Sequence, residues 1–286
     1  MELGPIGIWS SQLWGERATV MEAAAELEAL GYGALWFPNR AAMFERARDL
    51  LDATSRVVVA TGIASIWMHS AAEVAAAHHS IREAHPGRFL LGLGVSHAHL
   101  VDRNEPGRYS RPLEKMREYL DRLGAAPTPV PVSERVLAAL GPRMLALARD
   151  RSSGAHPYLG TPEHTRRARQ VLGSDRLLAP EQAVVLETDP SRARAIARQH
   201  LSVYLQAPNY TNNWLRLGFA AEDFAGGGSD RLVDAVVAWG SEDEIKQRIA
   251  QHHQAGADHV CLQVIPTNRA DLPREEWRAL AAALSL

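Results

Sequence analysis

Two histidines directly follow a glycine-rich apolar segment, "GRFLLGLGVSHAHL", which runs from Gly87 to Leu100. The ordinary pKa of histidine lies close to neutral pH, so His97 could move a proton in a reaction. His97 and His99 are two residues apart and would share one face of an extended strand. No carboxylate or cysteine stands nearby at the spacing of a zinc site, so the pattern disfavours a metal centre.

The two glycines of this segment have more than one interpretation. A dinucleotide-binding turn needs the pattern G-x-G-x-x-G, and here His97 stands where the third glycine belongs. Gly92 and Gly94 fall on one face of the expected strand. They either fill a narrow part of a barrel or leave room for a flat ligand at the strand's end.

Further residues that could take part in catalysis or binding follow other apolar runs. Asn39 and Arg40 come after "ALWF", and His69 comes after "ASIWM". Gly62 interrupts the apolar run "VVVATGIASI", which indicates a bulge, a close approach to a ligand, or a packing glycine. "LGP" at Leu140 and "GTP" at Gly160 each open a predicted helix, and the free N–H groups of a helix start bind phosphate. Gly-Pro is also a common turn signal.

The apolar runs predict eight strands that alternate with helices. The strand runs are apolar almost throughout, as is typical of parallel strands covered on both faces. A single long helical region, interrupted by "FAGGGSD", is expected over residues 190–246. Eight such units indicate a (β/α)8 barrel in one domain, residues 1–286, with a doubly wound open sheet as the alternative. The strands are expected at residues 6–9, 33–37, 57–66, 88–94, 134–140, 154–159, 181–187 and 258–265.

Composition narrows the class of protein. The 286 residues carry a net charge of −2 and a single cysteine, Cys261, which excludes an intrachain disulfide framework. No block of lysine and arginine indicates nucleic-acid binding. No signal peptide and no apolar run near 20 residues is present, so we expect a cytoplasmic protein without a membrane span.

Three blocks of the sequence resemble the luciferase-like family of flavin and deazaflavin oxidoreductases. They are "VATGIASIWMHSAAEVAAAHHSIREAHPGRFLLGLGVSHAHLVD", "LGPRMLALARDRSSGAHPYLGTPEHTRRARQVLG" and "GSEDEIKQRIAQHHQAGADHVCLQV". The similarity spans the whole chain, keeps the motif order, and is strongest to the branch that uses coenzyme F420, a 5-deazaflavin. The resemblance implies a luciferase-like (β/α)8 barrel, with FMN as the alternative cofactor because both dock in the same cleft.

The resemblance also assigns residues. Gly62 and Ile63 fall where relatives have a non-prolyl cis peptide bond behind the cofactor ring. Val95, Ser96 and His97 fall at the ring edge, and Leu140 and Gly141 fall in the segment that holds the cofactor phosphate. The helix-start pattern of "GTP", apart from the resemblance, makes Thr161 a further cofactor-binding candidate, and Asn39 is expected to contact the cofactor as well.

Asn39 and Arg40 stand where many deazaflavin relatives carry Asp-His, the histidine being the supposed proton donor. Arg40 cannot release a proton at neutral pH but could pair with an anionic group. His97 and His69 are therefore the candidates for proton transfer.

The expected function is hydride transfer between coenzyme F420 and a small organic substrate. The alternatives are an FMN-dependent monooxygenase that receives reduced flavin from a separate reductase, and a cofactor-binding barrel without catalysis. A homodimer is expected from the family resemblance.

Overall fold

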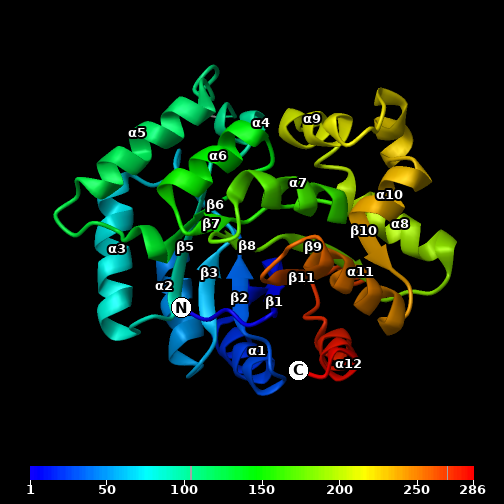
Figure 1. Ribbon diagram of the computed structural model, residues 1–286. Helices are drawn as coiled ribbons and strands as arrows, with labels where there is room; N and C mark the ends of the chain where they lie inside the picture. The colour runs from blue at the N-terminus through cyan, green and yellow to red at the C-terminus, as the bar shows by residue number, and fades with distance from the viewer. Residues whose placement is uncertain (104, 269) are drawn as a thin grey trace.

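The chain forms a parallel sheet rolled into a barrel and surrounded by helices (Figure 1). The computed structural model describes residues 1–103, 105–268 and 270–286. Its strands are β1 (Ile6–Trp9), β2 (Ala34–Phe37), β3 (Val58–Thr61), β4 (Ala64–Ser65), β5 (Phe89–Gly94), β6 (Arg135–Leu137), β7 (Gly154–Ala155), β8 (Leu177–Leu178), β9 (Glu181–Val185), β10 (Val237–Trp239) and β11 (Val260–Val264). The paired strands run in the order β10-β9-β11-β1-β2-β3-β5-β6-β7-β8, with β4 on β5.

The ring closes through the segment that contains β8 and β9. Only Ala179 and Pro180 separate these two strands. The N–H of Ala179 donates to the Ala155 carbonyl on one side, and the Pro180 carbonyl accepts from the Cys261 N–H on the other, both at 2.9 Å. β8 and β9 therefore act as one bent barrel strand between β7 and β11, and the predicted eight-unit barrel is confirmed.

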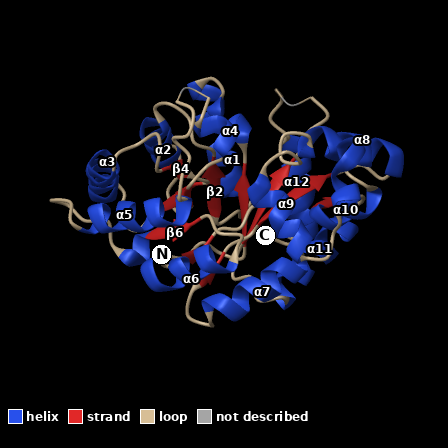
Figure 2. Cartoon of the chain, turned by 90° about the horizontal axis from the view of Figure 1, so that it is seen from above, coloured by secondary structure: helices blue, strands red, loops and turns tan. Residues whose placement is uncertain are grey.

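Helices cover the outside of the barrel, as the view from above shows (Figure 2). The chain runs back over the outside of the barrel between successive strands, as parallel pairing requires. The helices are α1 (Arg17–Ala29), α2 (Met43–Asp52), α3 (Ala71–Ala84), α4 (Ala98–Val101), α5 (Pro112–Gly124), α6 (Pro142–Arg151), α7 (Pro162–Leu172), α8 (Pro190–Leu201), α9 (Pro208–Arg216), α10 (Asp230–Val236), α11 (Glu242–Gln254) and α12 (Arg274–Leu284).

Three details differ from the sequence prediction. The run 57–66 is divided into β3 and β4 at Gly62, and pairing ends at Ser65. The region 190–246 is not helical throughout, because β10 lies within it and pairs with β9. The sixth strand pairs only over Gly154–Ala155, because Pro157 soon follows and has no N–H to donate.

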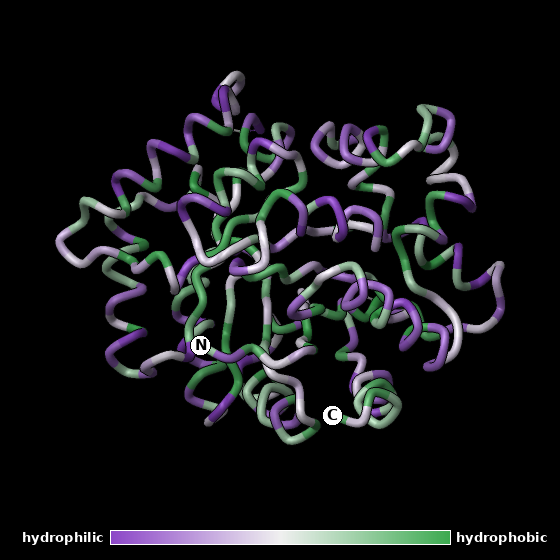
Figure 3. The backbone as a smooth tube through the Cα atoms, in the orientation of Figure 1, coloured by the Kyte–Doolittle hydropathy of each residue, from purple (hydrophilic) through white to green (hydrophobic). Residues whose placement is uncertain are grey.

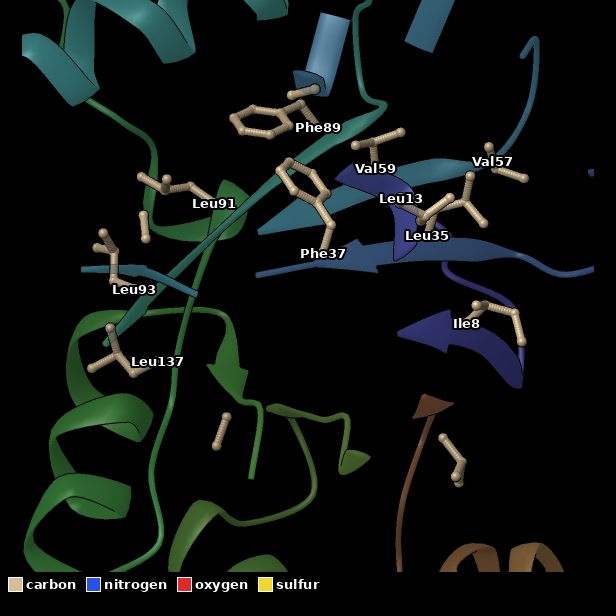
Figure 4. Packing of buried hydrophobic residues seen from close by; sticks show 14 of the residues in the cluster. Ile8, Leu13, Leu35, Phe37, Val57, Val59, Phe89, Leu91, Leu93 and Leu137 are labelled. Atoms are coloured by element: carbon tan, nitrogen blue, oxygen red, sulfur yellow. The ribbon is translucent and has the colours of Figure 1, made fainter. Parts of the chain in front are cut away.

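Alternate strand residues enter different cores, because successive side chains point to opposite faces. Ile8, Leu35, Phe37, Val59 and Leu91 belong to the large core between sheet and helices (Figure 4). The second set fills the barrel itself and consists of Leu3, Trp9, Ala34, Trp36, Val58, Ala60, Leu90, Val136, Ala179 and Cys261.

The hydropathy of the backbone follows this division, with apolar strands inside and polar outer helix faces (Figure 3). No helix among the described residues is long and apolar enough to cross a membrane.

Candidate active site

A cavity of about 760 Å³ opens at the carboxyl ends of the barrel strands. This end carries the active site in (β/α)8 enzymes, and the volume is within the usual range for a small-molecule site. α4 and α9 contribute to its walls. Its lining includes Trp9, Asn39, Gly62, Ile63, Ser65, Gly94, Val95, Ser96, His97, Arg108, Leu140, Gly141, His156, Tyr158, Tyr204, Asn209, Tyr210 and Arg216.

Gly62 and Ile63 form part of the cavity lining between β3 and β4. The peptide bond that joins them is cis, as the family resemblance predicts. The indole Nε1 of Trp9 donates to the Gly62 carbonyl at 3.1 Å. This hydrogen bond connects the end of β1 to the segment between β3 and β4.

Glycine is required at Gly92 and at Gly94 for different structural reasons. A Cβ at Gly92 would overlap the backbone carbonyl of Thr61, whose hydroxyl also donates to the Gly92 carbonyl at 2.8 Å. A Cβ at Gly94 would come within 2.6 Å of the Ile63 side chain. Gly92 therefore permits close strand approach, whereas Gly94 leaves room for Ile63 at the cavity.

His97 lies in the cavity wall where β5 turns into α4. Ser96 before it has a φ of 56°, a left-handed conformation that redirects the chain. His97 Nδ1 is 3.2 Å from the amide oxygen of Asn209, which only accepts, so Nδ1 donates. Burial lowers the pKa of His97 below its ordinary value. At neutral pH the ring is therefore uncharged, with Nε2 available to accept a proton.

Asn39 lines the cavity, and His69 lies behind it. The Asn39 amide oxygen accepts from the Ser65 N–H at 3.2 Å and from His69 Nε2 at 3.1 Å. His69 is not among the described residues that line the cavity. Burial lowers the pKa of its imidazole below the ordinary value. The structure therefore places His69 where it orients Asn39.

Arg40 lies on the surface rather than in the described cavity lining. Its guanidinium carbon is 5.8 Å from the ring centroid of Trp14, a cation–π distance. The Trp14 indole donates to the carbonyl of Pro38 at 3.1 Å. Asn39 and Arg40 thus point to different environments although they are adjacent in sequence.

The start of α6 forms another part of the cavity wall. Gly141 is its N-cap without a side-chain bond, and Pro142 occupies the first turn. Arg216, at the end of α9, lines the same cavity, and a Cβ at Gly141 would lie 3.6 Å from its guanidinium. Pro142 has no N–H, and the Met144 N–H donates to the Gly141 carbonyl at 3.1 Å. The remaining first-turn N–H groups and the Arg216 guanidinium make a binding site for an anion such as phosphate.

His164 and Thr161 support this wall from α7. His164 Nε2 donates to the Leu140 carbonyl at 2.9 Å. The Thr161 hydroxyl accepts from the His164 N–H at 3.2 Å and so caps α7. Thr161 is not among the described residues that line the cavity. The contact observed for its hydroxyl is therefore the cap of α7, which stabilises the helix start.

The charged side chains that line the cavity, among the described residues, are all basic. Within the described parts of the chain, no aspartate or glutamate lines it, whereas Arg108 and Arg216 do. Over the same residues, no cluster of three or more histidine, cysteine, aspartate or glutamate side chains could hold a metal ion. The lining favours an organic anion.

Sequence reasoning did not identify several lining residues. Asn209, Tyr210 and Arg216 come from α9, within the region expected only as helix. His156 and Tyr158 come from "GAHPYL", and their spacing of two residues on an expected strand could have placed both on one face. The Tyr158 hydroxyl donates to the Gln263 amide oxygen at 2.6 Å and lies 3.0 Å from the Tyr204 hydroxyl.

Comparisons with solved structures give the same fold. An F420-dependent secondary alcohol dehydrogenase, solved with an F420-acetone adduct, has a TM-score of 0.76 at 15% identity and 99% coverage of both chains. A coenzyme F420-dependent tetrahydromethanopterin reductase from Methanopyrus kandleri has a TM-score of 0.76 at 14% identity, covering 100% of this chain and 99% of its own.

An FMN-bound enzyme shares the fold as well. The oxygenating constituent of 3,6-diketocamphane monooxygenase, a type II Baeyer-Villiger monooxygenase from Pseudomonas putida, has a TM-score of 0.67 at 14% identity, covering 97% of this chain and 96% of its own. No curated protein sequence matches the chain. The family model described as luciferase-like monooxygenase matches residues 7–259. The chain therefore belongs to the luciferase-like monooxygenase family.

Proposed function

We propose that the cavity binds coenzyme F420 and that the protein transfers a hydride between this coenzyme and a small organic substrate. The observation that carries the proposal is the anion site at the start of α6, where Gly141 and Arg216 meet in a cavity that no described aspartate or glutamate lines. Coenzyme F420 carries a phosphate that this site suits. The resemblance to the F420 branch and the two F420-dependent structural neighbours support the choice of coenzyme.

The residues present fit a deazaflavin. The cavity is large enough for a tricyclic ring, and Gly62, Ile63, Val95 and Ser96 offer it largely apolar and backbone surface. The N–H groups near Gly141 and the Arg216 guanidinium would hold the phosphate. When bound, the coenzyme supplies a two-electron hydride acceptor or donor, which the side chains themselves lack.

His97 then defines the proton chemistry. Its lowered pKa and its Nδ1 bond to Asn209 leave Nε2 as a base at neutral pH. A base takes the hydroxyl proton from an alcohol that is being oxidised to a carbonyl compound. We therefore assign His97 as the proton acceptor in alcohol oxidation, and Asn39, held by His69, as a hydrogen-bonding contact to substrate.

An FMN-dependent monooxygenase, supplied with reduced flavin by a separate reductase, is the second candidate. The phosphate site suits FMN equally well, and an FMN-bound monooxygenase shares the fold. The cavity lining therefore fits a flavin ring as well as a deazaflavin ring.

Separate fluorescence titrations with coenzyme F420 and FMN test the proposal. We expect saturable binding of F420 that is tighter than that of FMN. Arg216→Met should weaken F420 binding, whereas Arg192→Met, a surface variant that removes the ion pair with Glu187, should not. Tight binding of FMN alone would favour the monooxygenase, and binding of neither would refute both candidates.

A further inference from the structure

The cavity has a second arginine, which the anion site at the start of α6 does not use. Arg108 lies in the segment between α4 and α5 and lines the cavity. Its side chain is 43% exposed, so a ligand in the cavity can reach the guanidinium. One N–H of this group donates to the Trp67 carbonyl at 2.7 Å. A guanidinium has five N–H donors in a planar fork, so most of them remain for other contacts.

The ion pair that Arg108 already makes is weak. Its Nη1 lies 3.5 Å from the carboxylate of Glu105, which is largely exposed. An exposed pair of this kind contributes little, because water screens both charges. No aspartate or glutamate among the described residues lines the cavity itself. Inside the cavity, Arg108 therefore has no counterion from the part of the chain that the structure describes.

Arg108 and Arg216 stand at separate points of the barrel rim. The Arg108 guanidinium is bonded to Trp67, which follows β4. The Arg216 guanidinium lies near Gly141, which follows β6. β5 pairs with both of these strands and so separates them. Two strand spacings amount to about 10 Å along the rim, so one phosphate or carboxylate cannot contact both arginines.

Trp67 connects Arg108 to the turn that carries His97. The Trp67 carbonyl accepts from Arg108, and its indole Nε1 donates to the Val95 carbonyl at 2.8 Å. Val95 stands two residues before His97, the proposed proton acceptor. Arg108 and His97 are therefore joined through a single tryptophan and belong to the same side of the cavity.

The proposed substrate contact Asn39 belongs to this side as well. Its amide oxygen accepts from the Ser65 N–H and from His69 Nε2, two residues before and two residues after Trp67. Arg216 does not belong to it. It stands seven residues along α9 from Asn209, the partner of His97, which is about 10 Å of helix.

We propose that Arg108 binds a carboxylate of the substrate, which makes the substrate a hydroxycarboxylate. This assignment rests on the proposed function, because it takes His97 as the proton acceptor and the oxidised coenzyme as the hydride acceptor. Oxidation breaks the C–H and O–H bonds of the alcohol carbon and its hydroxyl group. The hydride passes with its electron pair to the coenzyme, and the proton passes to His97 Nε2. The carboxylate stays unchanged at Arg108, so the product is an oxocarboxylate.

A binding test uses 2-, 3- and 4-hydroxypentanoate and their amides, which have nearly the same shape without the charge. Calorimetric titration of the protein without coenzyme compares the wild type, Arg108→Met and the matched control Arg111→Met. Arg111 lies in the same segment, pairs with Glu114 three residues away, and is not among the described residues that line the cavity. The wild type should bind at least one acid about tenfold to hundredfold more tightly than its amide. Arg108→Met should lose this preference, and Arg111→Met should keep it.

Turnover with coenzyme F420 provides a second readout. In the wild type, kcat/KM should be higher for the preferred acid than for its amide, and Arg108→Met should remove this difference. The affinity for F420 alone, measured by fluorescence titration, should be the same in both proteins. Arg108→Lys keeps the charge without the planar fork and should retain part of the preference. Arg108→Gln should lose the preference, and it replaces Arg108→Met if circular dichroism shows that this variant does not fold.

The outcomes separate the inference from the proposed function. If the wild type binds and oxidises the amides as well as the acids, the inference is overturned and the proposed function stands. If Arg108→Met weakens F420 binding and leaves the preference for the acid intact, the carboxylate belongs to the coenzyme, and the inference is again overturned. If the acids bind through Arg108 but no alcohol reduces F420, the carboxylate site stands and the proposed function is contradicted.

Discussion

Three fully buried histidines make the folded protein sensitive to acid. Burial lowers the pKa of His156 and of His259 to about 4, and that of His252 to about 3. Burial also raises the pKa of the Glu181 carboxyl, which is fully buried, to about 8. These four groups bind protons at different pH in the folded and unfolded chains, so they couple stability to pH.

The two kinds of group act with opposite sign. Unfolded histidine takes up a proton near pH 6.5, while the folded form resists until about pH 4. The histidines therefore stabilise the fold fully above pH 6.5, and this contribution is lost as the pH falls. Glu181 stays protonated in the folded state over the same interval and reduces the loss by about one proton.

The resulting magnitude is measurable. Between pH 7 and pH 5 the unfolded chain binds on average about one more proton than the folded chain at these four groups. The four groups together lower the free energy of unfolding by about 3 kcal/mol over the interval, and His78, whose pKa burial also lowers to about 4, adds to this loss. Such a loss is a large share of the usual 5–15 kcal/mol of a folded domain.

Urea denaturation followed by circular dichroism at pH 7.0, 6.0 and 5.0 measures the effect. We expect the unfolding midpoint to fall steadily, with an unchanged denaturant dependence of the free energy. Glu181→Gln removes the opposing carboxyl, so the loss of free energy for this variant over the interval should be about 2.5 kcal/mol larger than for the wild type. The reasoning would be refuted if the free energy of unfolding stayed constant to within about 1 kcal/mol between pH 7 and pH 5, and if it changed with pH equally in the wild type and Glu181→Gln.

Three further variants test the site and its support. Arg216→Met should weaken FMN and F420 binding about tenfold to hundredfold by calorimetric titration, while riboflavin, which lacks phosphate, keeps its affinity; equal losses would contradict a phosphate contact. His97→Phe should slow alcohol oxidation about hundredfold at pH 7 with little change in cofactor affinity, and unchanged turnover would remove His97 from proton transfer. Gly92→Ala should lower the melting temperature by several degrees, because its Cβ overlaps the Thr61 carbonyl; an unchanged Tm would show that the strands can separate there.

The fold could be predicted from the sequence because most of its longer strands are continuous apolar runs. Apolar runs such as "FLLGLG" and "VCLQV" are buried along their whole length, as parallel strands in a barrel must be. β10 could not be predicted, because three residues between two helices become a strand only when the exposed edge of β9 is available to pair with them.

The site could be predicted only where the residues lie shortly after the end of a strand. His97, Gly62 and Gly141 lie at strand ends and line the cavity, as strand position alone suggests. Arg40 shows the limit, because the turn after β2 directs Asn39 inward and its neighbour to the surface. Arg216 reaches the site only because α9 packs over the barrel mouth, which depends on tertiary packing.

Anaerobic absorbance spectroscopy of coenzyme F420 mixed with the protein and a panel of small secondary alcohols tests the central claim most directly. We predict loss of the oxidised coenzyme's visible band with at least one alcohol. The rate should rise with pH as His97 loses its proton, and Arg216→Met should slow the reaction when the coenzyme is not saturating. No spectral change with any alcohol, together with substrate oxygenation when reduced FMN and oxygen are supplied, would contradict the account.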